Sequence, residues 1–228
     1  MKHLKTTGII LSRIDYGEAD RILTVLTPDH GKLRLLARGV RKVKSKLAGG
    51  IELFSTSDIT FIQGRGEMGT LISTRLIKHY GHIIDDIDRV QLGYELIKTL
   101  NRATEDHPEQ EYFELLDQAF AALDDKAIDL SLIRVWFEAR LLRTAGHSPN
   151  LRTDTEGVKL EAGRKYDFDH EAMAFKLNDD GKYNPGDIKT LRLLFSTNSP
   201  EHINNVQGIA PALKNTELLI RTMSRDFL

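Results

Sequence analysis

The sequence predicts an α+β protein in which a five-stranded β-barrel over residues 1–80 is followed by a mainly α-helical domain over residues 81–228. Near residue 81 the hydrophobic pattern changes from short runs separated by turn residues to a helical repeat. The charge changes at the same place, because residues 1–80 hold 14 Lys and Arg against 7 Asp and Glu, whereas residues 81–228 hold 18 against 26. Such a difference indicates two domains with different functions.

Five segments of the first 80 residues have the composition and spacing of β-strands. They are residues 8–15, 21–27, 32–39, 51–63 and 68–76. In the third segment apolar side chains alternate with mostly cationic ones, which predicts a half-buried strand with a cationic exposed face. Five strands in so short a stretch are typical of a small barrel. The expected topology is the OB-fold, which commonly binds nucleic acid.

From residue 81 onward, apolar side chains recur at helical spacing. Helices are expected at about 83–100, 112–123, 130–142, 185–195 and 211–223. The first three are joined by short polar loops and therefore predict a helical bundle. Residues 151–184 are polar, with β-like pieces at 158–160, 165–168 and 172–177, so a small β-rich insert is expected there.

A run of seven cations is the strongest functional feature. It consists of Lys32, Arg34, Arg38, Arg41, Lys42, Lys44 and Lys46. No acidic residue lies between Gly31 and Ile51. Contacts with successive phosphates release counterions and their effects accumulate, so this run predicts a DNA-binding surface. An ordinary solvated loop and an anionic lipid site are the alternatives.

Aromatic side chains for base stacking are sparse in this half of the chain. The candidates before Tyr80 are Tyr16, Phe54 and Phe61, and Phe61 is expected in the core. The sequence therefore predicts contact with the phosphate backbone and little sequence readout.

Other motifs have simpler interpretations. The G-x-G-x-x-G match at residues 64–69 precedes a strand-like segment, so a hairpin turn is favoured over a dinucleotide site. His79 and His82 lie near Asp85, Asp86 and Asp88, which permits a metal site or a Mg²⁺-dependent nuclease or phosphotransferase. Helix capping by the aspartates is the favoured reading.

The chain has no cysteine, which excludes disulfides and thiol chemistry. No stretch approaches the roughly 20 apolar residues that span a bilayer. We expect a cytoplasmic, nucleoid-associated protein that is not an enzyme, with no catalytic residues, cofactor, metal, membrane contact or small-molecule substrate.

Three segments in fixed order carry a family resemblance: residues 16–23 (YGEADRIL), 27–32 (TPDHGK) and 37–42 (ARGVRK). Their order and spacing resemble the RecO family of DNA repair proteins. Residues 146–151 (GHSPNL) also look like a helix-ending segment of that family. Many members carry a four-cysteine zinc site just beyond it, where this chain has Asp154 and Gly157, so the insert is expected to be metal-free.

The resemblance implies a recombination mediator. Such proteins bind single- and double-stranded DNA, anneal complementary strands, work with RecR and help load RecA onto DNA coated with single-stranded-DNA-binding protein (SSB). DNA contact is carried over to the seven cations of residues 32–46. An RNA- or ribosome-binding OB-fold protein is the alternative.

A partner site is expected on the helix over residues 129–145. Arg134, Arg140 and Arg143 lie on it beside an apolar stripe. The stripe consists of Leu130, Ile133, Phe137, Leu141 and Leu142. An apolar groove with a cationic rim suits the acidic, aromatic C-terminal tail of SSB. In the alternative reading, the stripe is bundle core and the arginines pair with local acids such as Glu138.

Overall fold

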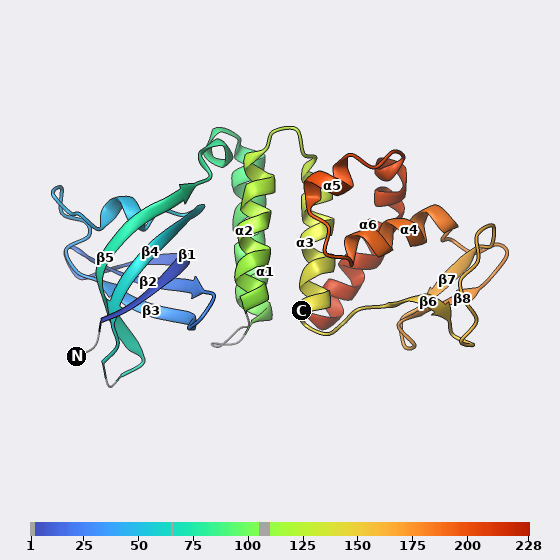
Figure 1. Ribbon diagram of the computed structural model, residues 1–228, viewed down its shortest axis with the longest axis horizontal. Helices are drawn as coiled ribbons and strands as arrows, with labels where there is room; N and C mark the ends of the chain where they lie inside the picture. The colour runs from blue at the N-terminus through green and yellow to red at the C-terminus, as the bar shows by residue number, and fades with distance from the viewer. Residues whose placement is uncertain (1–2, 65, 105–109) are drawn as a thin grey trace. The chain divides into compact units, whose positions relative to one another are not determined.

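The computed structural model describes residues 3–64, 66–104 and 110–228 (Figure 1). Its contacts divide the chain into two compact units, Met1–Lys126 and Ala127–Leu228. The predicted α+β class, with a five-stranded sheet followed by helices and a small second sheet, is confirmed. The domain boundary expected at residue 80 falls inside the first compact unit and stays a prediction.

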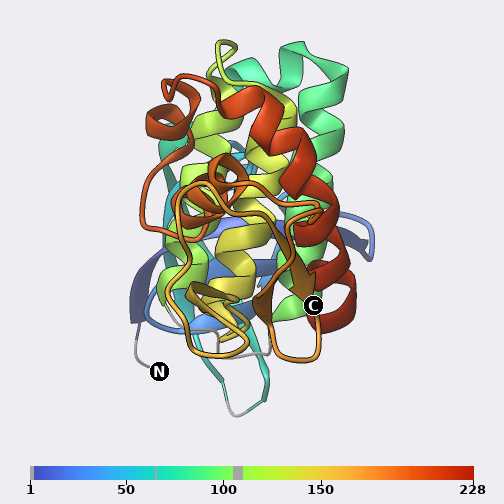
Figure 2. The same cartoon turned by 90° about the vertical axis from the view of Figure 1, so that its right-hand side faces the viewer.

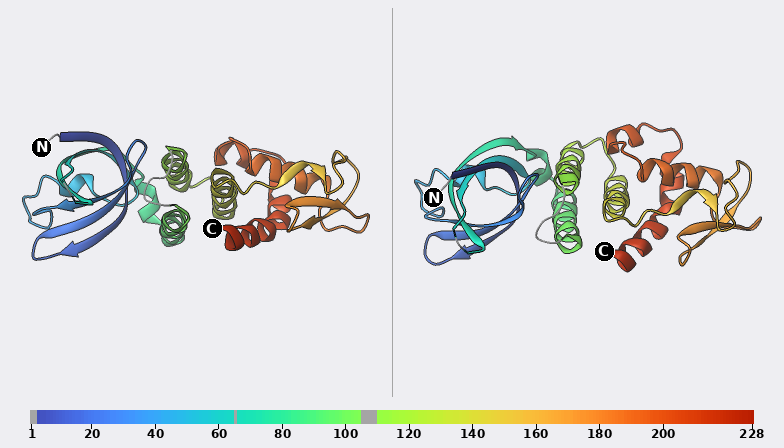
Figure 3. Two further views of the ribbon diagram at one scale, coloured as in Figure 1. Left: turned by 90° about the horizontal axis from the view of Figure 1, so that it is seen from below. Right: turned by 60° about the horizontal axis from the view of Figure 1, so that its bottom comes forward.

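The five N-terminal strands form a closed barrel. They are β1 (His3–Tyr16), β2 (Asp20–Thr27), β3 (Gly31–Ala37), β4 (Ser55–Ile62) and β5 (Met68–His79). Their order around the barrel, β1-β2-β3-β5-β4, is that of an OB-fold (Figure 3). β1 pairs with β4 up to Ile9 and with β2 from Ile9 onward, and a bulge between Ile10 and Ser12 marks the change.

The strand expected over residues 51–63 begins later than predicted. A 3₁₀ turn, η1 (Ala48–Gly50), precedes it, and β4 starts only at Ser55. Phe54 has a positive φ of 55°, which interrupts the extended chain, and its side chain is buried. The side chain packs against helices of the same unit instead of continuing the strand, and the alternating pattern of the sequence does not reveal this.

Two helices complete the first unit. A 3₁₀ turn, η2 (Gly81–Asp85), leads into α1 (Ile87–Ala103), and α2 (Gln110–Asp124) follows. The carboxylate of Asp86 accepts the backbone N–H groups of Asp88 and Arg89 at 2.9 and 3.4 Å, so the capping reading of this aspartate is confirmed. The buried guanidinium of Arg89 donates to the carbonyls of Leu123, Asp125 and Lys126 and thereby satisfies the C-terminal end of α2.

An aromatic cluster joins the barrel to these helices. The ring of Phe54 meets Tyr94 of α1 and Phe120 of α2 edge to face, at centroid distances of 5.5 and 5.4 Å. Gly93 is required for this approach, because a Cβ atom there would lie 2.5 Å from the Phe54 ring. The hydroxyl of Tyr80 donates to Asp117 at 2.6 Å, and burial raises the pKa of Tyr80 well above its ordinary value.

The second unit combines helices with a small β-sheet (Figure 2). Its elements are α3 (Leu130–Thr144), β6 (Asn150–Asp154), β7 (Tyr166–Asp169), β8 (Ala174–Leu177), α4 (Pro185–Leu194), α5 (Pro200–Asn204) and α6 (Ile209–Phe227). α3 packs against α6 and α4, and its Trp136 is fully buried and donates to the carbonyl of Asn198 at 2.9 Å. α5 is a short turn of helix that the hydrophobic repeat did not predict.

The insert forms a three-stranded sheet in the order β6-β8-β7. Phe175 is fully buried at its centre and meets the rings of Tyr166, Phe168 and Tyr183 edge to face. These contacts supply the apolar core that so small a sheet needs. The first strand was predicted at residues 158–160 but lies at β6, and the later segment contributes only a bridge between Lys159 and Thr153.

Two aspartates hold the tight turns of this insert. The carboxylate of Asp154 accepts the backbone N–H groups of Glu156 and Val158 at 3.0 and 2.8 Å. Asp169 does the same for Glu171 and Ala172, both at 3.0 Å. Side-chain hydrogen bonds of this kind stabilise tight turns.

Candidate nucleic-acid interface

β3 presents a cationic outer face, as its alternation predicts. Leu35 and Ala37 are fully buried in the barrel, whereas Arg34 is exposed on the other side. Arg38 follows at the end of the strand and is also exposed. Arg34 on the strand and Arg38 just after it therefore both present their guanidinium groups to solvent.

The chain then forms the basic loop, defined here as residues 38–46. Two backbone hydrogen bonds shape it: the N–H of Lys42 donates to Gly39 at 3.1 Å, and that of Ser45 donates to Lys42 at 2.9 Å. Gly39 supplies the left-handed turn at its start with a φ of 63°. Among the described residues, the exposed side chains of Arg38, Lys42, Lys44 and Lys46 have no hydrogen-bond or ion-pair partner. Backbone hydrogen bonds shape the loop, while these four charges face water.

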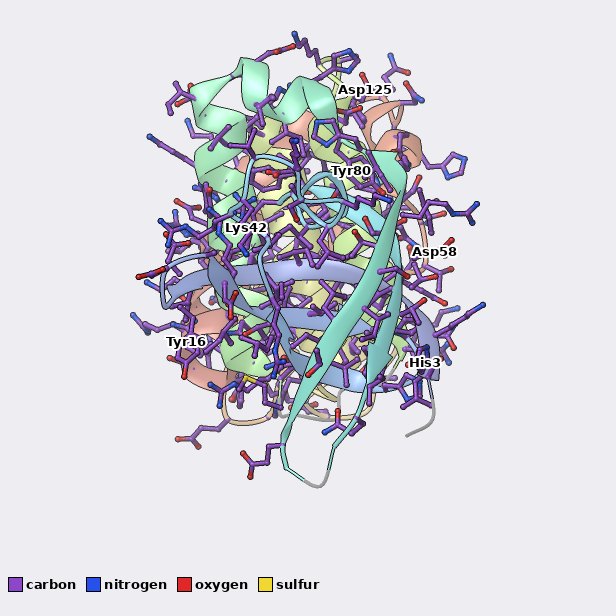
Figure 4. All side chains as sticks on the ribbon, turned by 90° about the vertical axis from the view of Figure 1, so that its left-hand side faces the viewer. His3, Tyr16, Lys42, Asp58, Tyr80 and Asp125 are labelled. Atoms are coloured by element: carbon purple, nitrogen blue, oxygen red, sulfur yellow. The ribbon has the colours of Figure 1, made fainter. Side chains whose placement is uncertain are left out.

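The β1–β2 hairpin holds the start of the basic loop. The N–H of Gly39 donates to the Asp20 carboxylate at 2.7 Å, and the N–H of Arg41 donates to the carbonyl of Ala19 at 2.9 Å. Asp15 lies 3.5 Å from the Arg41 guanidinium. In Figure 4, Tyr16 of this hairpin and Lys42 of the loop lie on the same side of the barrel, away from His3 and Asp58.

Asp15 interacts with two arginines where the hairpin meets the basic loop, Arg21 and Arg41. Its carboxylate accepts a hydrogen bond from Arg21 at 2.9 Å, and this bond, together with the nearby positive charge of Arg41, holds the pKa of Asp15 below its ordinary value. Arg41 therefore has a structural role in addition to its position in the cationic run.

Lys32 is placed differently from the other six cations. Its ammonium group donates to the carbonyls of Asn101 and Thr104 at 2.9 and 2.8 Å, at the C-terminal end of α1. A cation there satisfies open carbonyls and interacts favourably with the helix dipole. Lys32 therefore links the barrel to the C-terminal end of α1.

The aromatic candidates divide clearly. Phe54 and Phe61 are buried, at 3% and 1% exposure, so the expectation that Phe61 belongs to the core is confirmed. Tyr16 is 53% exposed at the hairpin beside the basic loop. It is the candidate of the three with a ring face available to a ligand.

The remaining motifs have structural roles. Residues 64–69 join the antiparallel strands β4 and β5, which excludes a dinucleotide-binding turn, and Arg65 at its centre lies outside the described residues. Asp85 lies 3.4 Å from Lys126, and His82 contacts Asp124. Within the described part of the chain, no three His, Asp or Glu side chains are grouped to hold a metal ion, and no helix is long and apolar enough to cross a bilayer.

The apolar groove expected along α3 is corrected by the structure. Of the predicted stripe, Ile133, Phe137, Leu141 and Leu142 are fully buried. The arginines are used locally as well. Arg140 and Arg143 donate to the carbonyls of Ser196 and Phe195, both at 2.8 Å, just beyond the end of α4. Arg134 is half-buried, and burial raises the pKa of Glu138 one turn along the helix.

One of these arginines nevertheless lines an open hollow of about 500 Å³ in the second unit. The lining residues are Arg143, Ser148, Pro149, Asn150, Leu151, Arg152, Arg192 and Phe195. They include three arginines and no acid. The Nε of Arg192 donates to the carbonyl of Leu151 at 2.9 Å, which fixes one guanidinium, while Arg152 has no side-chain partner among the described residues.

The charge of the helical half is distributed unevenly. Residues 81–126 hold 4 Lys and Arg against 12 Asp and Glu, whereas residues 127–228 hold 14 of each. The acidity assigned from sequence to the whole C-terminal half therefore resides in the segment of α1 and α2. The second unit is neutral, so a cationic hollow in it can attract an anion.

Two family models match the chain. The model described as recombination protein O N terminal matches residues 1–80, and the model described as recombination protein O C terminal matches residues 84–223. The protein belongs to the RecO family. The first RecO model covers the barrel with its basic loop, and the second covers nearly all of the helices and the insert.

Curated relatives agree with this assignment. The chain is 33% identical over 154 residues to the "DNA repair protein RecO" of Desulfatibacillum aliphaticivorans, covering 66% of this chain and 60% of that protein. It is 32% identical over 151 residues to the RecO protein of Acetivibrio thermocellus and 33% identical over 151 residues to that of Myxococcus xanthus. These alignments span about three fifths of the RecO relatives' length.

The sequence had no signal for two members of these sites. Arg152 and Arg192 come from β6 and α4, and only folding brings them to Arg143. Tyr16 was a weak candidate because its exposure depends on the hairpin.

Proposed function

We propose that this RecO-family chain is a recombination mediator that binds single- and double-stranded DNA through the basic loop and Arg34 and promotes annealing of complementary strands. The observation that carries this proposal is the hydrogen-bonded loop in which Arg38, Lys42, Lys44 and Lys46 are exposed and have no internal partner among the described residues. Unpaired cations on a fixed backbone contact phosphates without first breaking an ion pair. Lys32 and Arg41 contribute less, because both make structural contacts.

The mechanism is electrostatic and involves no covalent chemistry. Cations reduce the repulsion between two phosphate backbones and hold both strands at high local concentration, so that pairing is faster. We also propose, from the family resemblance, that the protein works with RecR and helps load RecA onto SSB-coated DNA.

Strand annealing tests this function directly. The full chain is expected to accelerate the pairing of complementary oligonucleotides, and the acceleration should decline as salt rises because the contacts are with phosphates. Fluorescence quenching between labelled strands measures the rate, and incubation with Mg²⁺ should give no cleavage products. An annealing rate equal to that without protein, or displacement of the DNA by structured RNA at much lower concentration, would contradict the proposal.

A second proposal concerns the arginine hollow of the second unit. We propose that it receives an acidic, apolar-ended tail of the kind that SSB presents. Pro149 and Phe195 offer apolar contacts, and three guanidinium groups suit carboxylates. In this proposal Arg143 keeps the role predicted from sequence, whereas Arg134 and Arg140 do not line the hollow and Arg140 donates to the carbonyl of Ser196.

The variant that isolates this hollow is Arg152→Glu, because that side chain has no internal partner among the described residues. We expect it to weaken binding of a labelled SSB tail peptide about tenfold or more, since it removes one charge-assisted contact and adds repulsion. Fluorescence anisotropy provides the measurement. Lys214→Glu is the matched control, because Lys214 is also exposed, lies on α6 and does not line the hollow. Equal weakening by both variants would show that the effect is general charge and not this hollow.

A further inference from the structure

Strand pairing places an apolar row on the outer face of the barrel. Ile14 pairs with Ile22 across β1 and β2, and Ile22 pairs with Leu36 across β2 and β3. Paired residues point to the same face of a sheet. The neighbouring Leu23 and Leu35 are buried inside the barrel, so this row faces outward. Ile14 is 61% exposed, whereas Ile22 and Leu36 are half-buried.

The rows on either side of this one are polar or aromatic. Arg34 and Arg38 flank Leu36 at alternate positions along β3, and both are exposed. Tyr16 follows Ile14 at an alternate position on β1 and pairs with Asp20. One face therefore carries an apolar row, an open aromatic ring and two cations within three adjacent strands.

Hydrogen bonds attach the hairpin that carries Tyr16 to the start of the basic loop. Asp20, the cross-strand partner of Tyr16, accepts the N–H of Gly39 at 2.7 Å, and Ala19 accepts that of Arg41 at 2.9 Å. The hairpin that carries the exposed ring of Tyr16 is therefore attached to the start of the loop that carries the cations. The flanking cations make an anionic polymer with planar apolar groups the complementary occupant of this face.

We propose that Ile14, Tyr16, Ile22 and Leu36 form a base platform that binds unstacked nucleobases of a single strand. This inference rests on the proposed DNA-binding function and adds to it a preference for single strands. In a duplex the faces of the bases are covered by their neighbours, so only the phosphates remain for the basic loop. Tyr16 supplies the stacking surface, and the aliphatic row supports the adjacent base.

Three DNA probes separate the platform from the cations: a thymidine oligonucleotide, an abasic oligonucleotide of equal length, and a duplex. The full chain is expected to bind the thymidine strand about tenfold more tightly than the abasic strand, the scale of one aromatic–base stack. Tyr16→Ala should remove most of that difference and leave duplex affinity unchanged. Tyr16→Phe keeps the ring and should restore the preference. Fluorescence anisotropy measures all three affinities.

The outcomes distinguish failure of the base platform from failure of the proposed DNA-binding function. If the wild type binds none of the probes, the proposed DNA-binding function fails and the platform fails with it. If the wild type binds DNA but Tyr16→Ala keeps the same ratio of thymidine to abasic affinity, only the platform is overturned. Ile14→Thr provides a second variant on the same exposed row and should reduce the same ratio, while circular dichroism verifies that both variants remain folded.

Discussion

Reversing three charges of the basic loop is expected to weaken single-stranded DNA binding about 100-fold or more at about 100 mM salt. The variant is Arg38→Glu/Lys42→Glu/Lys44→Glu. Each of these side chains is exposed and without a partner among the described residues, so each substitution removes a phosphate contact and adds repulsion. The dependence of log affinity on log salt should become shallower by about 2, at roughly 0.7 per lost contact. A salt titration of fluorescence anisotropy measures both quantities.

The choice of residues follows from the structure. Arg41 is left intact because its guanidinium faces Asp15, and a glutamate there would oppose that carboxylate and loosen the hairpin. The control variant, Lys165→Glu/Lys176→Glu/Lys214→Glu, makes the same change in net charge with exposed residues of the second unit. If the control loses as much affinity as the loop variant, net charge rather than the loop determines binding. If the loop variant keeps the wild-type salt slope, the interface lies elsewhere.

Truncation of Phe54 is expected to have the largest effect on stability. Phe54→Ala should lower the free energy of unfolding by about 3–5 kcal/mol, the usual cost of removing a buried phenylalanine side chain. The ring is 3% exposed and contacts Tyr94 and Phe120, so its loss opens a cavity between the barrel and both helices of the first unit. Urea denaturation followed by circular dichroism measures the change.

Tyr16→Ala is the matched control for this truncation. It also removes an aromatic ring, but from a 53% exposed position, and should change the free energy of unfolding by about 0.5 kcal/mol or less. Phe54→Ala should therefore lower stability, whereas Tyr16→Ala should change single-stranded DNA binding and leave stability nearly unchanged. A Phe54→Ala protein within about 1 kcal/mol of the wild type would mean that the barrel does not depend on α1 and α2. That result would favour a domain boundary at residue 80.

Local pattern sufficed for much of the fold. Alternation in β3 and the helical repeats of α1, α2 and α3 depend only on neighbouring residues, so the class, the barrel and these helices followed from sequence. The predicted bundle of the three helices stays a prediction, because α3 belongs to the second compact unit. The start of β4 could not be predicted in this way. Phe54 leaves the strand to contact Tyr94 and Phe120, which lie 40 and 66 positions further along the chain. The missed strand β6 likewise acquires its partner from β8, distant in sequence.

The sequence by itself determined the RecO resemblance and the existence of a cationic run, since both are properties of consecutive residues. Only the tertiary structure decided which cations remain open to a ligand. Lys32 and Lys42 belong to the same cationic run, and the sequence does not distinguish their roles. In the structure Lys32 donates to carbonyls at the end of α1, whereas Lys42 faces water. Likewise, only the folded structure places Arg152 of β6 and Arg192 of α4 beside Arg143 in one hollow. Side-chain partners are set by packing between distant segments, and a local pattern carries no information about them.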